Sequence, residues 1–217
     1  GPTGMAAAYF LARGGVETTI FEREATLGGV PRHVIPSFRI AEETIEKDIA
    51  LMEKQGVEVK CGAPAPSVAE LKAMGYTHIL FAVGAWKAGR LDIEGAVAGA
   101  IQWMKGVKAG NIAVAGSVAV VGAGNTAMDA ARLAKRSGAE SVTIVYRRTK
   151  KYMPADEHEL ALAIADGVNF AELAAPVKQA DGLLTCEKMV LGEADASGRR
   201  SPVGTGEYFT IPCDLVI

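Results

Sequence analysis

Cysteine is scarce in this sequence, and the spacing of its cysteines excludes several kinds of site. The three cysteines, Cys61, Cys186 and Cys213, lie far apart and form no C-x-x-C pair. A redox-active dithiol, a zinc knuckle and an iron–sulfur cluster all need more closely spaced ligands. We therefore expect three structural thiols and no metal site.

The sequence also lacks a large charge of one sign and a long apolar run. Its formal net charge is -2 and no basic block stands out, which argues against nucleic acid as a partner. No apolar run approaches the roughly 20 residues that cross a bilayer, and the start of the chain lacks the layout of a signal peptide. Since 49% of residues are hydrophobic and 22% charged, the composition is that of a folded globular protein. We expect a cytoplasmic protein with no membrane partner.

Helix and strand patterns alternate along the first part of the chain. One segment favours a helix closed by a glycine pair, and a short β-branched segment after it favours a strand. The apolar residues of the next helix recur at i, i+4 and i+7 before Gly56, and two more strands follow. The pattern predicts a first α/β domain over about residues 1–88, with these elements at 5–12, 18–21, 45–52, 57–59 and 78–83.

The same pattern starts again after a stretch rich in glycine and alanine. Residues 89–116 hold one short helix around 101–104 and have the composition of a crossing between domains. The pattern then predicts two strand–helix pairs, followed by strands on either side of a turn-rich segment at 192–206. We therefore predict an α/β fold of two Rossmann-like dinucleotide-binding domains, the second over 117–217 with a small antiparallel β meander. Its elements are expected at 118–121, 125–135, 142–146, 160–167, 183–191 and 207–211.

A glycine fingerprint opens the second domain. It is a G-x-G-x-x-A sequence between an expected strand and an expected helix, made of Gly122, Ala123, Gly124, Asn125, Thr126 and Ala127. In this context Gly122 permits a tight turn and Gly124 leaves room for a pyrophosphate, while the helix N-terminus offers unpaired N–H groups. The alternative is a turn of small residues with no ligand. The position of the glycine fingerprint between a strand and a helix favours a dinucleotide site over this alternative.

The residues after the next strand indicate which dinucleotide is bound. A dinucleotide fold has an acid there for the ribose of NAD, or cationic groups for the extra phosphate of NADP. This chain has Arg147 and Arg148, 25 residues after Gly122. An arginine fork matches a phosphate in a bidentate manner. The sequence therefore predicts NADPH over NADH, the alternative being two arginines on a solvated loop.

The first residues of the chain are typical of half of a second fingerprint. Gly1 and Gly4 precede a helix, and 21 residues after Gly1 an expected strand ends in Glu22, an acid suited to a ribose hydroxyl. The pair Gly28 and Gly29 would let the backbone approach a flat ligand. The alternative is a flexible start and an ordinary surface glutamate. Because the chain begins inside this motif and ends in an apolar strand, we expect it to be cut at both ends.

Taken together, these motifs resemble those of a known flavoprotein family. They run over residues 22–30, 35–40, 122–129, 146–148 and 153–155, and they are similar to the FAD/NADPH module of the glutamate synthase small subunit and of dihydropyrimidine dehydrogenase. Residues 145–148, 191–193 and 198–200 are most similar to the branch of selenate reductase-type iron–sulfur subunits. The resemblance covers nearly the whole chain and implies a pyridine nucleotide-disulfide oxidoreductase-like fold.

This resemblance implies FAD and NADPH as cofactors and assigns residues to each. The FAD-binding residues would be Gly1, Pro2, Thr3, Gly4, Glu22, Arg23, Gly28, Gly29, Val30 and Arg39. The NADPH-binding residues would be Gly122, Ala123, Gly124, Asn125, Thr126, Asp129, Arg147 and Arg148. The family's opening strand and the segment that closes over the flavin lie outside residues 1–217, so we expect the chain alone to bind FAD poorly.

The resemblance also implies a reaction. NADPH would pass a hydride to FAD, and the electrons would go on to iron–sulfur centres elsewhere in the parent protein. Hydride transfer needs no general acid or base, so we assign no catalytic residue. The alternative function is a non-catalytic module that binds or senses NADPH.

Two polar features fall outside this assignment. The acids and histidine at 156–159 favour a polar helix start over a metal site, because metal ligands on a helix need i, i+3 or i, i+4 spacing. His33 lies between the glycine pair and Ile35, so a position beside the flavin is one interpretation of it.

Overall fold

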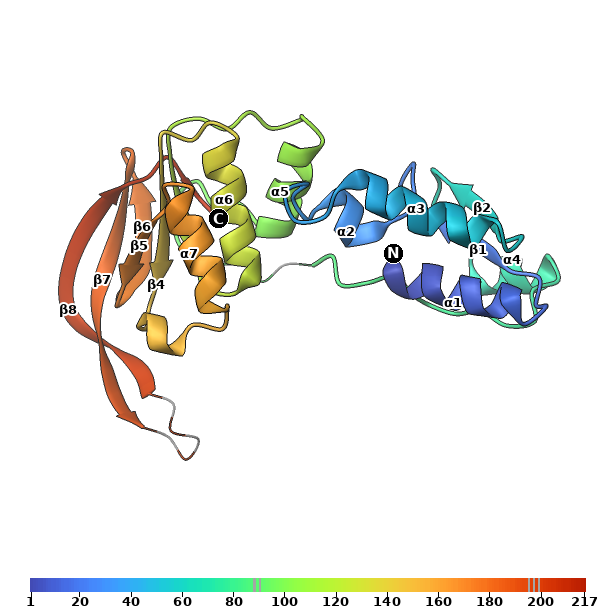
Figure 1. Cartoon of the computed structure of the whole chain (residues 1–217). Coiled ribbons are helices and arrows are strands. Elements are labelled where there is room, and N and C mark those ends of the chain that lie inside the picture. Colours follow the sequence, from blue (N-terminus) through green and yellow to red (C-terminus); the bar gives the residue numbers. More distant parts are fainter. Residues whose placement is uncertain (88, 90, 195, 197, 199) are drawn as a thin grey trace. The chain divides into compact units, whose positions relative to one another are not determined.

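The computed structural model describes residues 1–217 except Ala88, Arg90, Asp195, Ser197 and Arg199. The chain folds into two compact units, Gly1–Trp86 and Lys87–Ile217 (Figure 1). The stretch 89–116, expected as a crossing, belongs to the second unit and contributes the helix α5 (Ala100–Lys108) to it.

The first unit packs helices against a two-stranded parallel sheet. Residues Ala8, Leu27, Ile45, Ile49, Met52 and Val57 form its buried core. The strands pair in register, with Ile20 opposite Val59. The elements are α1 (Pro2–Arg13), β1 (Thr19–Glu22), α2 (Gly29–His33), α3 (Glu42–Glu53), β2 (Glu58–Cys61) and α4 (Val68–Ala73).

Local sequence signals account for the helices of the first unit. Helix α1 has proline in its first turn, where a missing N–H costs nothing, and Gly14 caps its C-terminal end. Helix α4 starts with a capping box in which the Ser67 hydroxyl and the Glu70 carboxylate accept hydrogen bonds from each other's backbone N–H. The i, i+4, i+7 residues expected in a helix are the buried face of α3.

The strand expected at 78–83 is wrong. These residues have no regular secondary structure, and Leu80, Phe81 and Val83 are 64%, 71% and 73% exposed. A strand is defined by ladder hydrogen bonds to a neighbour, and the described residues of the first unit provide only the β1–β2 pair. An apolar, β-branched composition cannot make a strand without such a partner.

The second unit is built on a four-stranded parallel sheet. The strand order is β5-β4-β3-β9, which matches the 3-2-1-4 order of a dinucleotide-binding sheet. Its strands are β3 (Ser117–Val121), β4 (Ser141–Tyr146), β5 (Asn169–Glu172) and β9 (Leu215–Val216). The helices α6 (Asn125–Arg136) and α7 (Glu157–Ala165) and the short η1 (Lys150–Tyr152) complete the alternating pattern.

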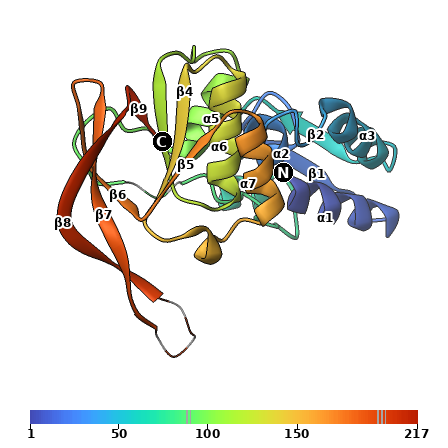
Figure 2. The same cartoon turned by 60° about the vertical axis from the view of Figure 1, so that its left-hand side comes forward.

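An antiparallel sheet covers the opposite face of the parallel sheet from α6 and α7 (Figure 2). It consists of β6 (Ala174–Ala180), β7 (Leu183–Ala194) and β8 (Arg200–Pro212), in that order. The core between the two sheets includes Ala119, Val145, Leu184, Cys186, Cys213 and Val216. The predicted meander is thus confirmed.

The turn-rich segment expected at 192–206 is largely strand. Val190 lies opposite Val203 and Leu191 opposite Pro202, so β7 and β8 extend well into it. Glycine and proline there predicted turns, but β8 is an edge strand, where proline is tolerated because one side of its backbone needs no partner.

A buried ion pair joins α6 to the end of α7. Arg132 is 6% exposed, and its Nε lies 2.7 Å from the Asp166 carboxylate, which also accepts from Arg136 at 2.7 Å. Hydrogen bonds from Arg136 and then Arg132 lower the pKa of Asp166 to about 2, against the opposing effect of burial. At the other end of α7, the Asp156 carboxylate accepts from the His158 N–H at 2.8 Å. The acids at 156–159 therefore include a helix cap.

Candidate nucleotide-binding sites

The glycine turn of the second unit stands at the end of a buried strand. Residues 118–120 of β3 are at most 2% exposed, and the strand delivers Gly122 in the left-handed region at φ 127°. The Gly122 N–H donates to the Val145 carbonyl of β4 at 3.0 Å. β3 lies between β4 and β9, which is the point where the strand order reverses and where open α/β sheets bind ligands.

Open space and unpaired donors lie just beyond this turn. A Cβ added at Gly124 would meet no atom within 4 Å. Asn125 and Thr126 are exposed at the start of α6, and no side chain caps the helix. Across the described part of the unit, nothing accepts from their backbone N–H groups. A helix start with free N–H groups beside open space fits a phosphate.

Other predicted residues support the turn from within the unit. Ala123 is buried, and its carbonyl accepts from the Ala155 N–H at 3.0 Å, which brings the Met-Pro-Ala segment against the glycine turn. Ala127 is also buried, as expected for the close approach of helix and sheet. Asp129 is half-buried one turn further along α6.

The two arginines follow the neighbouring strand but differ in their surroundings. Both come directly after β4, the strand whose Val145 bonds to Gly122. Arg147 is exposed and has no side-chain partner among the described residues. Arg148 is half-buried, and its Nε donates to the Arg200 carbonyl of β8 at 3.1 Å. The structure thus brings both arginines to the edge that carries the glycine turn.

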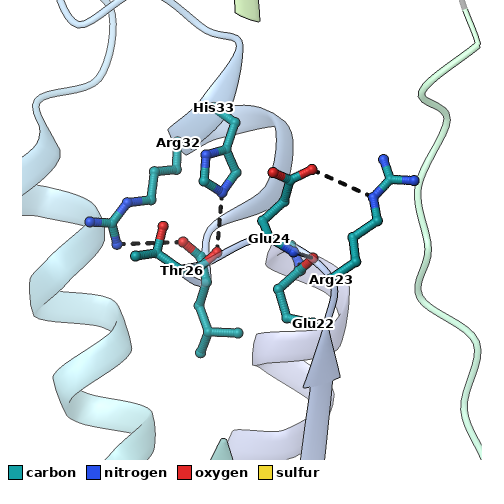
Figure 3. Close-up of polar contacts among 8 residues, drawn as sticks. Glu22, Arg23, Glu24, Thr26, Arg32 and His33 are labelled. Carbon is teal, nitrogen blue, oxygen red and sulfur yellow. Dashed lines mark hydrogen bonds and ion pairs between the residues drawn. The ribbon is translucent and has the colours of Figure 1, made fainter. Parts of the chain in front are cut away.

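Three predicted FAD residues of the first unit meet in space. The Gly1 nitrogen lies 3.8 Å from the Glu22 carboxylate at the end of β1. Gly29 has φ 60°, and a Cβ added there would lie 2.6 Å from the Gly1 Cα. The two glycine segments therefore touch through their backbones, which is possible only without side chains. The Glu22 carboxylate also accepts from the Glu24 N–H at 3.1 Å (Figure 3).

Sequence reasoning missed an aromatic residue beside this cluster. The Arg23 guanidinium lies 5.0 Å from the centre of the Trp86 ring and 3.5 Å from the Glu24 carboxylate. Trp86 follows Gly84, whose φ is 71°. A glycine and an aromatic residue directly after an apolar run was the signal that could have found it. A guanidinium within cation–π range of an aromatic ring forms a flat, polarisable surface with it.

The loop after Glu24 is held by contacts within it, from His33 to Thr26 and from Arg32 to the Leu27 carbonyl (Figure 3), and by contacts from Arg32 to α3. Arg32 binds the Glu42 carboxylate at 2.8 Å and that of Glu46 at 2.5 Å. His33 Nε2 lies 3.1 Å from the Thr26 carbonyl. These contacts hold the loop around the glycine pair, so the structure gives His33 a local structural role.

The remaining FAD candidates lie in neighbouring segments of the first unit. Val30 lies on α2, and its carbonyl accepts from the Val34 N–H at 2.9 Å. The Arg39 N–H donates to the Pro36 carbonyl at 2.9 Å within a turn. Pro2, Thr3 and Gly4 form the first turn of α1.

The cysteines are poor nucleophiles in this fold. Burial, with a contribution from Cys213, raises the pKa of Cys186 to about 11. Burial also raises the pKa of Cys213 and, ahead of the charge of Glu22, that of Cys61. Over the described part of the chain, no group of three or more His, Cys, Asp or Glu could hold a metal ion. None of the described helices is both long and apolar enough to span a membrane.

The chain belongs to the pyridine nucleotide-disulphide oxidoreductase family, whose model matches residues 1–216. YgfK of Escherichia coli (strain K12) is 44% identical over 224 residues, and the whole chain covers 22% of it. The NADPH-Fe(3+) oxidoreductase subunit beta of Geobacter sulfurreducens (strain DL-1 / KN400) is 36% identical over 239 residues, with 35% of it covered. The glutamate synthase (NADPH) small chain of Azospirillum brasilense is 35% identical, with 50% of it covered.

Solved structures agree with this assignment at the level of the fold. Mycobacterium tuberculosis FprA in complex with NADPH superposes with a TM-score of 0.74 at 19% identity, covering 98% of this chain and 66% of FprA. Thioredoxin reductase of T. acidophilum gives a TM-score of 0.58 at 14% identity, covering 98% of this chain and 71% of that protein. The expected fold class and the resemblance to the glutamate synthase small subunit are confirmed. The family match and these relatives support FAD and NADPH as cofactors.

Proposed function

We propose that the chain is the FAD- and NADPH-binding module of an oxidoreductase in which a hydride passes from NADPH to FAD. One observation carries this proposal: each unit presents glycines, a helix start and a charged residue together at a strand end. The charged residue is the acid Glu22 in the first unit and the cation Arg147 in the second. This difference suits a free ribose hydroxyl in one site and a 2′-phosphate in the other.

The residues of the second unit fit NADPH. The free N–H groups of Asn125 and Thr126 would hold the pyrophosphate in the space that Gly124 leaves open. Arg147 would bind the 2′-phosphate through charge-assisted hydrogen bonds. We assign residues 117–217 to this NADPH-binding domain, with 89–116 leading into it.

The residues of the first unit fit FAD. Glu22 would accept a hydrogen bond from the adenosine ribose, and the facing backbones of Gly1 and Gly29 would let the pyrophosphate approach. Arg23 and Trp86 offer a flat face for the adenine. We assign residues 1–88 to the FAD-binding domain. When bound, the nicotinamide and the flavin supply the redox chemistry, while the protein orients them and excludes water.

The next electron acceptor lies outside this chain. The relatives are named as an NADPH-Fe(3+) oxidoreductase subunit, an NADP(+)-dependent formate dehydrogenase subunit and a glutamate synthase small chain. These names support a partner domain or subunit, and we propose that electrons pass to iron–sulfur centres there. The selenate reductase-type branch and the cytoplasmic location stay predictions.

Anaerobic flavin reduction tests the proposal. The full-length parent protein, purified and incubated with FAD, should carry a visible flavin spectrum that NADPH bleaches faster than NADH. A protein that binds NADPH but neither holds FAD nor lets NADPH bleach it would overturn the proposed hydride transfer and support the non-catalytic alternative. The variant Lys188→Ala removes one exposed cation from β7 and should behave as wild type, because its surface ion pair with Glu207 is worth little.

A further inference from the structure

The unequal surroundings of Arg147 and Arg148 raise the question of whether both read the phosphate. Arg147 is exposed and has no partner among the described residues, so its fork is available to a ligand. The Nε–H of Arg148 is already engaged by the Arg200 carbonyl at 3.1 Å. Two adjacent arginines with such different environments are expected to have different roles.

The main chain around Arg148 is also tied to the antiparallel sheet. The Arg148 carbonyl accepts from the Leu173 N–H at 3.1 Å, and the Leu173 carbonyl accepts from the Met189 N–H of β7 at 2.8 Å. Leu173 has φ 51°, a conformation that a leucine adopts only when its surroundings hold it. Arg148 is therefore linked to β7 indirectly, through Leu173, and to β8 directly, through its side chain.

This network fixes where β8 begins. Arg200 is the first residue of β8 and lies opposite Ala194 of β7. The β7–β8 hairpin extends past the parallel sheet on the side of η1, the segment that follows the two arginines (Figure 1 and Figure 2). The side chain of Arg200 is exposed and has no partner in the described part of the chain. The main chain that carries this third arginine is thus held beside Arg148 by the hydrogen bond to the Arg200 carbonyl.

We propose that Arg200 is a specificity residue for the 2′-phosphate, and that Arg148 is a positioning residue that acts by holding the hairpin. The phosphate would be bound by Arg147 from β4 and Arg200 from β8, one fork from each sheet. A phosphate carries three acceptor oxygens and close to two negative charges, which two forks can satisfy together. This inference rests on the proposed NADPH site of the second unit.

One substitution separates positioning from phosphate binding at Arg148. In glutamine, the side-chain nitrogen stands the same number of bonds from Cα as the Nε of arginine, but the side chain is uncharged. Arg148→Gln can therefore still donate to the Arg200 carbonyl, whereas Arg148→Ala cannot. A positioning role predicts that Gln restores binding, and a phosphate-reading role predicts that Gln behaves as Ala.

The experiment is calorimetric titration of the full chain with NADP⁺ and NAD⁺, which bind without hydride transfer. Losing charge-assisted bonds should weaken NADP⁺ about 10-fold or more in Arg147→Ala and about 5-fold in Arg200→Ala, with NAD⁺ unchanged in both. Arg148→Ala should lower NADP⁺ affinity as much as Arg200→Ala does. The double variant Arg148→Ala/Arg200→Ala should bind NADP⁺ no more weakly than either single variant, because both act through one contact. The NADP⁺ affinity of Arg148→Gln should stay within about twofold of wild type. The unchanged NAD⁺ affinity reports that each variant is folded, and Lys188→Ala is the control for a lost cation on the hairpin.

Failure of this inference is distinct from failure of the proposed function. If the wild-type chain binds NADP⁺ and NAD⁺ equally, the NADPH site itself is wrong. If Arg147→Ala removes the preference while Arg200→Ala leaves it intact, only the role of Arg200 is overturned. An Arg148→Gln variant as weak as Arg148→Ala would make Arg148 a phosphate reader.

Discussion

The glycine turn of the second unit stands on a buried strand, whereas the glycines of the first unit are held mainly by each other. Val118, Ala119 and Val120 are at most 2% exposed, and β3 has a parallel neighbour on each side. In the first unit every residue of β1 is half-buried, β1 pairs with β2 alone in the described chain, and Gly1 touches Gly29 through the backbone. The stability of the first unit should therefore respond to a single methyl added at this glycine contact, and that of the second unit to loss of packing far from the ligand.

The largest expected effect is on the stability of the second unit. Asp166→Asn leaves the buried Arg132 without the carboxylate it binds, which should cost about 3–5 kcal/mol in free energy of unfolding. The chain has two tryptophans, so a Trp86→Phe background leaves Trp103 to report on this unit during urea unfolding.

Asp181→Asn is the matched control for this prediction. Asp181 is exposed, has φ 52° and lies in the same unit, and asparagine tolerates that conformation. It should change the stability by less than about 0.5 kcal/mol. Equal effects of the two substitutions would show that the ion pair does not support the sheet.

The next effect is confined to the first unit. In Gly29→Ala the new Cβ would lie 2.6 Å from the Gly1 Cα, and in Gly15→Ala it would meet nothing within 4 Å, although both glycines have positive φ. Both variants share the backbone strain, so the clash should lower the free energy of unfolding of Gly29→Ala by an extra ~1–3 kcal/mol relative to Gly15→Ala. FAD titration should show weaker binding in Gly29→Ala than in Gly15→Ala. Equal FAD affinities would contradict the close approach of the two glycine segments.

The second unit was the more predictable from sequence, because its sites stand on strands that are buried and paired. Its strands are short apolar runs bounded by turn residues, and its fingerprint lies between a strand and a helix that both form. The apolar run at 78–83 looked like a strand but lacks a partner in the described chain, and pairing is a property of two segments rather than one.

Contacts between distant segments account for what the sequence left out of the sites. The approach of Gly1 to Gly29 and of Arg23 to Trp86 depends on how loops fold back, which no local spacing encodes. The asymmetry of Arg147 and Arg148 likewise comes from β8, more than 50 residues further along the chain. The residue types at the strand ends were predictable, and their partners were not.

The pH dependence of stability gives a smaller effect on the second unit. The pKa of Asp166 falls from 3.8 to about 2 on folding, because Arg136 and Arg132 bind the charged form. A lowered folded pKa contributes stability above the unfolded value, and this contribution is lost as the pH falls from about 4 to 2. The difference in unfolding free energy between wild type and Asp166→Asn should shrink by about 2 kcal/mol over that range. A constant difference would mean that the carboxylate titrates normally.

The smallest effect on stability should accompany a clear effect on binding, at Gly124. Its φ is -92°, and an added Cβ meets no protein atom within 4 Å, so Gly124→Ala should change the unfolding free energy by less than about 1 kcal/mol. The methyl would project into the space assigned to the pyrophosphate, which NADP⁺ and NAD⁺ share. Both coenzymes should therefore weaken equally, about 10-fold or more, unlike Arg147→Ala, which should weaken NADP⁺ alone. Titration of both coenzymes decides this: unchanged affinities would place the pyrophosphate elsewhere, and a loss restricted to NADP⁺ would place the 2′-phosphate at this turn.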